Sequence, residues 1–326
     1  MVVSGGGDDG EPELPLETVS VFLRKKQISS LIVAFKPDDI CPVKGYESFG
    51  TSCNGRYVIG VEQNVYEFKL IENNSPIWSK LPPTKVDRSG SKCCLITENK
   101  IFVTGGYGQG LFSSEILSVE CCDPSQYVPL SKNSRCVSIH TGSYTNSKAH
   151  WKICSTNPPV NVRYHTMTYL GKGKVMLIGG MNLKRGDDVY SKNVFLGEIT
   201  NDQEDVKWRT LDSLIKCRYG HIAFKLGNDV ITAGGCNRFE KHKSCEIYNL
   251  RHGEWKLSKH SLPIGLSNAS VVVDSQERFA VITGGETDNY KTSNRIFLYT
   301  KINGFIEYQH CKLSTGRKGH ISLIVR

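Results

Sequence analysis

Three segments of the chain place an arginine two or three residues before a histidine. The pairs are Arg163/His165, Arg218/His221 and Arg317/His320. Such a pair could grip an anion, because a guanidinium offers a permanent charge and several N–H donors. In the alternative, structural interpretation, each arginine binds a carboxylate or carbonyl of a neighbouring segment while the histidine caps a turn. Since the pairs recur at corresponding places along the chain, we favour the structural role.

A second set of residues combines cations with aromatic rings. It comprises Lys184, Arg185, Arg238, Phe239, Lys241, His242, Lys243, Tyr290 and Lys291. Lysine and arginine contact phosphates, and aromatic rings stack on unpaired bases, so these residues are candidates for a surface that binds RNA or another partner. Exposed loops of most proteins are charged as well, and a merely solvated role is the alternative.

Glycine-rich segments resemble nucleotide-binding turns but lack their context. GYGQG at residues 106–110 is not followed by the helical periodicity that a dinucleotide or S-adenosylmethionine site requires. GKGK at residues 171–174 lacks the spacing of a P-loop. No nucleophile elbow, zinc-protease motif or other catalytic signature is present in the sequence. We therefore expect no catalytic, cofactor-binding or metal-binding residues in this chain.

Composition indicates the cellular compartment of the protein more clearly than its function. The 12 cysteines show no zinc spacing and are typical of buried thiols in a reducing compartment. The sequence shows no leader peptide and no apolar run long enough to span a membrane, which predicts a cytoplasmic or nuclear protein with no membrane contact. A formal charge of +9 favours polyanionic partners without selecting one.

An internal repeat predicts the elements that position these residues. Runs of β-favouring residues end in Gly-Gly at residues 101–106, 175–180, 230–235 and 280–285, and a fifth copy lies at residues 2–7. Allowing for one insertion and one missing copy, the period is about 50 residues, as in kelch β-propellers. A double glycine suits the point where a strand leaves the crowded centre of such a ring, because side chains do not fit there.

Each blade can be divided into four strands, a to d, from the central channel outwards. In the blade at residues 217–263, strand a is 221–226, b is 230–235, c is 245–250 and d surrounds Trp255. Further blades cover residues 46–81, which lack the Gly-Gly, and residues 88–154, 163–214 and 266–314. We expect a long insertion at residues 123–148 between strands c and d of its blade. In the last blade Tyr308 is expected at the position of the tryptophan.

The two ends of the chain together supply a further blade. Residues 317–325 repeat only the first strand of a blade, and residues 2–6, 18–23 and 31–35 supply the others. Pairing them closes the ring and removes two exposed sheet edges. We therefore predict an all-β, six-bladed kelch β-propeller, a single domain over residues 1–326 with a disordered or loop-like segment at residues 7–16, and a monomer. The arginine–histidine pairs and the cationic loops should then surround one mouth of the channel.

Two segments resemble a particular family. RYHTMTYL at residues 163–170, followed by VMLIGG, and the Arg88-Ser89-Gly90 start that leads to IFVTGGYG are similar to the first blades of the C-terminal kelch domain of tRNA wybutosine-synthesising methyltransferases, which are leucine carboxyl methyltransferase-like enzymes. In that family a separate Rossmann-type domain binds S-adenosylmethionine and performs the chemistry. This chain contains no such domain, and Ser91 stands where a histidine would complete the Arg-x-x-His start.

Three functional hypotheses follow. In the first, the chain is a non-catalytic accessory propeller of wybutosine-type tRNA modification that binds tRNA or a methyltransferase partner. In the second, it is a protein–protein adaptor, such as a substrate receptor or a cytoskeletal binder. In the third, it is part of a longer S-adenosylmethionine-dependent tRNA methyltransferase whose catalytic residues lie outside this sequence.

Overall fold

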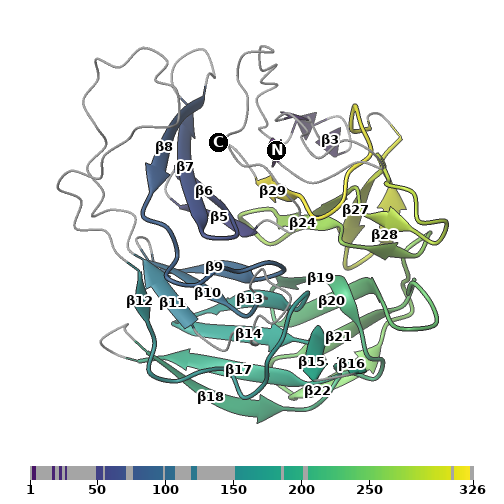
Figure 1. The fold of residues 1–326 in the computed structure, drawn as a ribbon. Coiled ribbons are helices and arrows are strands. Elements are labelled where there is room, and N and C mark those ends of the chain that lie inside the picture. Colours follow the sequence, from purple (N-terminus) through teal and green to yellow (C-terminus); the bar gives the residue numbers. More distant parts are fainter. Residues whose placement is uncertain are drawn as a thin grey trace.

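The structure is a computed structural model. It describes residues 2–4, 17–18, 22–23, 26–27, 49–53, 56–70, 76–97, 100–106, 119–122, 151–184, 187–200, 205–309 and 312–323. Every helix or strand within these ranges is a β-strand, and the sheets are arranged around a common centre (Figure 1). The all-β prediction is therefore confirmed for this part of the chain.

Five four-stranded antiparallel sheets repeat one meander. In chain order they are β5 (Phe49–Cys53), β6 (Arg56–Val61), β7 (Asn64–Leu70) and β8 (Pro76–Leu81); β9 (Lys92–Thr97), β10 (Lys100–Thr104), β11 (Val119–Cys122) and β12 (Lys152–Ile153); β13 (Thr166–Gly171), β14 (Lys174–Ile178), β17 (Val194–Ile199) and β18 (Val206–Leu211); β19 (Tyr219–Leu226), β20 (Asp229–Cys236), β21 (Cys245–Asn249) and β22 (Glu254–Leu257); and β24 (Ser270–Val273), β25 (Ala280–Thr283), β27 (Ile296–Thr300) and β28 (Gly304–Glu307). The four strands of each sheet correspond to the predicted strands a to d.

A three-stranded sheet joins the two ends of the chain. Its order is β2 (Glu17–Thr18), β1 (Val2–Ser4) and β29 (Ile321–Leu323), and Val3 lies opposite Ser322. Three two-stranded ribbons complete the described strands: β3 (Phe22–Leu23) with β4 (Lys26–Gln27), β15 (Met181–Lys184) with β16 (Asp187–Tyr190), and β23 (Leu266–Ser267) with β26 (Glu286–Thr287). The predicted insertion at 123–148, the segment at 7–16 and the strand at 31–35 lie outside the described residues.

The first strand of each sheet faces the centre of the molecule. In order around the centre, β5 contacts β9, β9 contacts β13, β13 contacts β19, β19 contacts β24, and β24 contacts β29 (Figure 1). Sheets arranged radially in this way form a β-propeller. The loops between strands b and c and those between strands d and a leave on one face, which we call the b–c face.

The hydrophobic cores lie in the seams between adjacent sheets. Trp255 of β22 packs against residues of the preceding sheet, and its indole N–H donates to the Asp212 carbonyl at 3.0 Å. The indole of Trp151 likewise donates to the Pro82 carbonyl at 2.8 Å. In both seams the acceptor is the residue directly after strand d of the preceding sheet.

The β24–β28 sheet departs from this pattern and from the prediction of Tyr308. Trp255 lies opposite Tyr248, and the residue in the same place opposite Tyr299 is Phe305. The prediction was wrong because β28 begins at Gly304, directly after a turn of three residues, so strand d comes earlier than the sequence pattern suggested. Three sheets have tryptophan in this register, the β9–β12 sheet has Trp151 directly before β12, and the fifth sheet has phenylalanine.

Candidate functional site

The double glycines lie where neighbouring sheets touch near the centre. Gly105 and Gly179 both have positive φ, 68° and 58°. A Cβ atom added to Gly105 would lie 2.5 Å from Cε1 of His165, and one added to Gly179 would lie 2.9 Å from Cε1 of His221. In each case the histidine belongs to the next sheet along the chain. The glycines are therefore required both by backbone conformation and by the approach of the neighbouring histidine.

The arginines of the predicted pairs lie mostly inside the protein. Arg218 is fully buried and donates to the Gly234 carbonyl at 2.7 Å and to the Glu246 carboxylate at 2.7 Å. Glu246 is itself buried and also accepts two backbone N–H groups. Arg317 is equally buried, whereas Arg163 is partly exposed, with its guanidinium 5.1 Å from the ring centre of Tyr164. Arg218 therefore fastens strands of its own sheet together rather than facing solvent.

The histidines of these pairs are buried and uncharged at neutral pH. Nε2 of His221 is 3.0 Å from the Thr166 hydroxyl, and Nε2 of His320 is 2.8 Å from that of Thr283. Burial, together with the charges of Lys92 and Arg88, lowers the pKa of His165 to about 3. Burial and a nearby arginine also lower the pKa values of the other two. Neutral rings inside the protein do not supply the charge that an anion site needs.

The cationic and aromatic residues occupy loops of the b–c face, with unequal exposure. Phe239 is 89% exposed and Tyr290 is 76% exposed, at the tips of loops from neighbouring sheets. They are flanked by three exposed cations, Arg238, Lys243 and Lys291. Within the part of the chain that the structure describes, no carboxylate forms an ion pair with any of these three. Lys184 ends β15, and Arg185 lies outside the described residues.

Lys241 differs from the other cations of this face. Its ammonium contacts the Glu286 carboxylate, donates to the Thr287 carbonyl at 2.9 Å and lies 4.3 Å from the ring centre of Tyr290. Lys318 also contacts Glu286. Burial by itself would raise the pKa of Glu286, but the hydrogen bonds from both lysines lower this pKa below its usual value. Lys241 therefore connects two neighbouring loops and is not available as a free charge.

His242 is also an interior residue. Its Nε2 is 3.0 Å from the Cys217 carbonyl, and its Nδ1 is 3.0 Å from the Glu240 carboxylate. Burial and the charge of Arg218 lower the pKa of this histidine. Of the predicted residues, the loops therefore bring Arg238, Phe239, Lys243, Tyr290 and Lys291 to the surface and place Lys241 and His242 beneath them.

Beside Tyr290 lies a polar hollow that the sequence pattern did not predict. Its volume is about 370 Å³, and it is lined by Ile264, Thr287, Asp288, Asn289, Thr292, Ser293, Asn294 and Arg295. Amide and carboxylate groups offer both donors and acceptors, so the hollow could recognise the polar edge of a ligand. The run of Asp, Asn, Thr and Ser between β25 and β27 was the available signal.

A second feature that the sequence pattern did not predict is a group of tyrosines on the same face. The rings of Tyr190 and Tyr219 are stacked, with centres 5.4 Å apart, and Tyr164 lies 5.9 Å from Tyr219. Two of the three directly follow an arginine of the repeat, which could have identified them. They extend the aromatic character of the b–c face to the preceding sheet.

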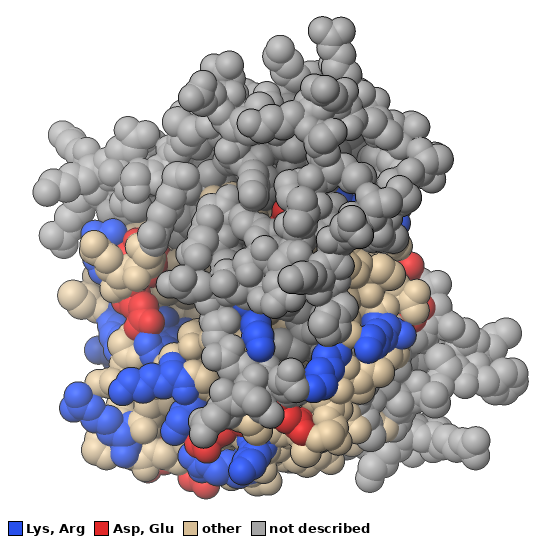
Figure 2. Space-filling view, turned by 90° about the vertical axis from the view of Figure 1, so that its left-hand side faces the viewer, with Lys and Arg blue, Asp and Glu red and all other residues tan. Residues whose placement is uncertain are grey.

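Positive charge is not confined to the b–c face. Figure 2 shows Lys and Arg side chains spread over the lower part of another side of the molecule, with fewer Asp and Glu side chains between them. Net charge alone therefore does not locate a binding surface. Among the described residues, the two most exposed aromatic rings, Phe239 and Tyr290, lie on the b–c face.

Neither a metal centre nor a membrane-spanning helix is found in the described residues. No group of His, Cys, Asp and Glu among them is arranged to hold a metal ion. The described part of the chain likewise has no helix of the length and apolarity needed to cross a membrane.

Comparison with known proteins supports the fold. No family model matches the chain, and no curated protein matches it by sequence. The solved structure of YjhT is similar over 86% of this chain and 88% of its own, with a TM-score of 0.64 and 15% sequence identity. At this identity the likeness shows the β-propeller fold alone.

Proposed function

We propose that the protein is a non-catalytic kelch propeller of six blades, closed by its two ends. The three-stranded sheet would be the sixth blade, with β29 as its innermost strand. The antiparallel pairing of β1 with β29 supports this proposal, as do the contacts that β29 makes with β24 on one side and with β5 on the other. Closure would leave neither β1 nor β29 as an unpaired strand where the two ends of the chain meet.

We propose further that the b–c face binds RNA. The observation that carries this proposal is the pair of exposed rings, Phe239 and Tyr290, flanked by cations without carboxylate partners among the described residues. Bases stack on such rings, at about 1–3 kcal/mol per base, while Arg238, Lys243 and Lys291 contact phosphates. The polar hollow beside Tyr290 offers donors and acceptors for the edge of an unstacked base.

The resemblance to the wybutosine-synthesising family selects tRNA as the first RNA to test. Its anticodon loop presents unpaired bases next to a dense row of phosphates, which matches rings flanked by cations. The methyltransferase that modifies the tRNA would be a second partner of the same complex. In the third hypothesis that enzyme is the remainder of a longer chain.

The test is a titration of labelled tRNA at several salt concentrations. We expect the triple variant Arg238→Ala/Lys243→Ala/Lys291→Ala to weaken binding and to flatten its salt dependence by about 0.7 in log–log slope for each phosphate that is no longer bound. Phe239→Ala/Tyr290→Ala should weaken binding about tenfold or more with an unchanged salt slope. The control Lys207→Ala/Arg209→Ala/Lys256→Ala removes three charges from the outer strands β18 and β22 and should bind like the wild type.

Two outcomes would reject RNA binding. One is wild-type binding no tighter than about millimolar at low salt. The other is equal weakening in the b–c variant and in the control, which would indicate attraction to net charge only. Exposed aromatic residues beside arginine are also typical of protein interfaces. The adaptor hypothesis would then become the first to test with the same variants.

A further inference from the structure

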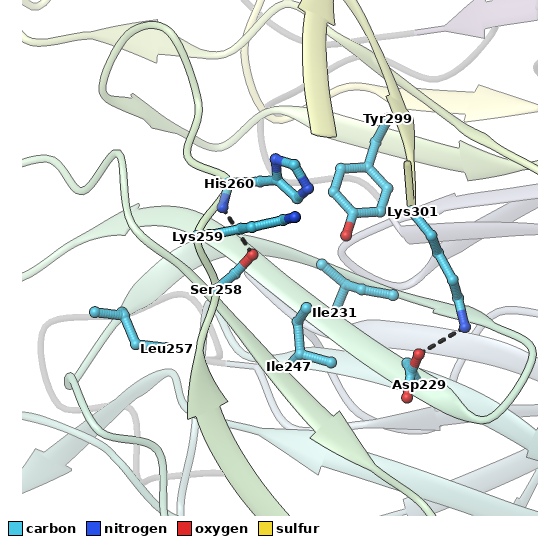
Figure 3. A pocket seen from close by; sticks show the side chains of 9 residues that line it. All are labelled: Asp229, Ile231, Ile247, Leu257, Ser258, Lys259, His260, Tyr299 and Lys301. Carbon is cyan, nitrogen blue, oxygen red and sulfur yellow. Dashed lines mark hydrogen bonds and ion pairs between the residues drawn. The ribbon is translucent and has the colours of Figure 1, made fainter. Parts of the chain in front are cut away.

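A hollow opens in the seam between the β19–β22 sheet and the β24–β28 sheet, apart from the b–c loops described above. Its volume is about 300 Å³, and Figure 3 shows the residues that line it: Asp229, Ile231, Ile247, Leu257, Ser258, Lys259, His260, Tyr299 and Lys301. Three aliphatic side chains and the Tyr299 ring form an apolar lining. Asp229 and Lys301 pair at one end, with 2.6 Å between their charged groups.

The hollow borders the one of these five sheets that has no tryptophan in or directly before strand d. In the preceding seam Trp255 reaches across and donates to the carbonyl of Asp212, which directly follows β18. The corresponding residue after β22 is Ser258, and it lines the hollow. Phe305 occupies the tryptophan position, packs against Tyr299 with ring centres 4.6 Å apart, and has no indole ring to extend toward Ser258. The hollow lies in this seam beside apolar side chains, on the side of the seam that Ser258 lines.

Polar groups of Tyr299, His260 and Lys259 are directed into this space. Tyr299 is only 1% exposed, and its hydroxyl points into the hollow (Figure 3). Nε2 of His260 is buried and lacks a partner within the described part of the chain. Figure 3 shows the Lys259 ammonium directed toward both rings, and no carboxylate of the described residues pairs with it. A buried imidazole nitrogen without a partner, a tyrosine hydroxyl and a lysine without a carboxylate partner among the described residues therefore surround an apolar space.

This combination selects a ligand with two parts. A flat apolar ring would lie against the aliphatic and aromatic part of the lining. An anionic group would accept hydrogen bonds from the Lys259 ammonium and the Tyr299 hydroxyl, because both are donors. Burial raises the pKa of Tyr299, so its hydroxyl keeps its proton at neutral pH.

We propose that this seam hollow is a binding site for a small aromatic carboxylate. The ring lies against Ile231 and Ile247, and the carboxylate lies between Lys259, His260 and Tyr299. No bond is made or broken in this site. The proposal does not depend on RNA binding, since none of its residues belongs to the b–c loops.

The experiment is a calorimetric titration of the purified protein with indole-3-carboxylate, indole and acetate as probes. We expect saturable binding of indole-3-carboxylate with a dissociation constant on the order of 1 mM or below, which is what a ligand of this size can achieve. Indole lacks the charge and acetate lacks the ring, so each should bind at least about tenfold more weakly.

Variants assign the binding to the hollow. Lys259→Ala and Tyr299→Phe should each weaken binding about tenfold, whereas Lys291→Ala removes the same charge from a b–c loop and should leave it unchanged. Phe305→Trp should fill the space and abolish binding. Tyr299→Phe keeps the ring and the packing, so it tests the site even if Phe305→Trp does not fold.

The proposal is overturned by any of three results. These are no saturable binding of indole-3-carboxylate up to about 10 mM, equal affinity for indole and indole-3-carboxylate, or undiminished binding by both Lys259→Ala and Tyr299→Phe. The b–c variants should lose RNA binding and keep carboxylate binding, and Lys259→Ala should do the reverse. Because the two measurements are independent, the failure of one proposal is distinguishable from the failure of the other.

Discussion

Arg218 and Arg238 lie on the same sheet, close in sequence, and have opposite roles. Arg218 precedes β19, is fully buried and is bound to Glu246, Ser244 and Gly234. Arg238 lies in the loop after β20 and is exposed. A cation that recurs with the repeat fastens the blade, whereas a cation in a loop that differs between blades is free to meet a partner. Whether an arginine recurs with the repeat therefore distinguishes structural from surface residues better than the residue type does.

The largest expected effect comes from breaking the scaffold where the chain ends meet. Deletion of residues 312–326 removes β29, which pairs with β1 and contacts β24, and so exposes one edge of β1 and one side of the β24–β28 sheet. Exposed strand edges pair with other molecules, so we expect aggregation or a collapsed melting temperature. Size-exclusion chromatography and thermal unfolding measure both. A truncated protein that stays monomeric and melts like the wild type would show that closure is dispensable.

Substitution of the two arginines tests the comparison directly. Arg218→Ala leaves Glu246 buried without its cation, which costs about 3–5 kcal/mol of unfolding free energy. Arg238→Ala is an exposed change and should stay within about 0.5 kcal/mol. Chemical denaturation of both variants gives the two values. Similar costs for the two would remove the distinction between scaffold and surface arginines.

The buried histidines sharpen the same comparison through pH. In the unfolded chain a histidine binds a proton below about pH 6.5, whereas the pKa of His165 in the folded protein is about 3. The unfolded state therefore gains protons first as the pH falls, so stability is lost between about pH 6.5 and pH 3. Each such histidine contributes a slope of up to about 1.4 kcal/mol per pH unit.

Replacement of a single histidine isolates this effect. His165→Gln should lower stability at pH 7 and should reduce the loss of unfolding free energy between pH 7 and pH 5, because one proton fewer is taken up on unfolding. Denaturation curves at both pH values measure the slope. His252→Gln, an exposed substitution, is the control. An unchanged slope in His165→Gln would mean that this ring is already protonated in the folded protein.

The smallest expected effect concerns Lys241, the loop cation that is tied down. Lys241→Ala should cost about 1 kcal/mol, because Glu286 loses one of its two lysine partners. Lys243→Ala, two residues away and exposed, should be close to neutral. Thermal unfolding of the pair measures the difference. Equal melting temperatures would place Lys241 among the free cations of the face.

The sequence predicted the fold well where sterics dictate the residue. Gly-Gly recurs because any side chain at Gly179 would collide with His221, so the repeat is visible without coordinates. The sequence predicted the cationic residues of the b–c face less well, because the carboxylates that pair with some of them belong to other sheets. Lys241 and Glu286 are 45 residues apart, and no local pattern indicates that they meet. The seam hollow was missed because the sequence pattern placed the tryptophan position at Tyr308, whereas the strand pairing places it at Phe305.

The pairing of Val3 with Ser322 has a consequence for protein synthesis. Strand β1 leaves the ribosome long before its partner β29 has been translated. The edge of β1 that pairs with β29 therefore stays unpaired while the intervening sheets are synthesised. Those sheets have neighbours within reach and can form in order, as domains usually do during translation. In the proposed six-bladed ring, β1 would therefore remain without its partner β29 until residues 321–323 have been synthesised, and a ribosome that stalls earlier would release a ring that is still open.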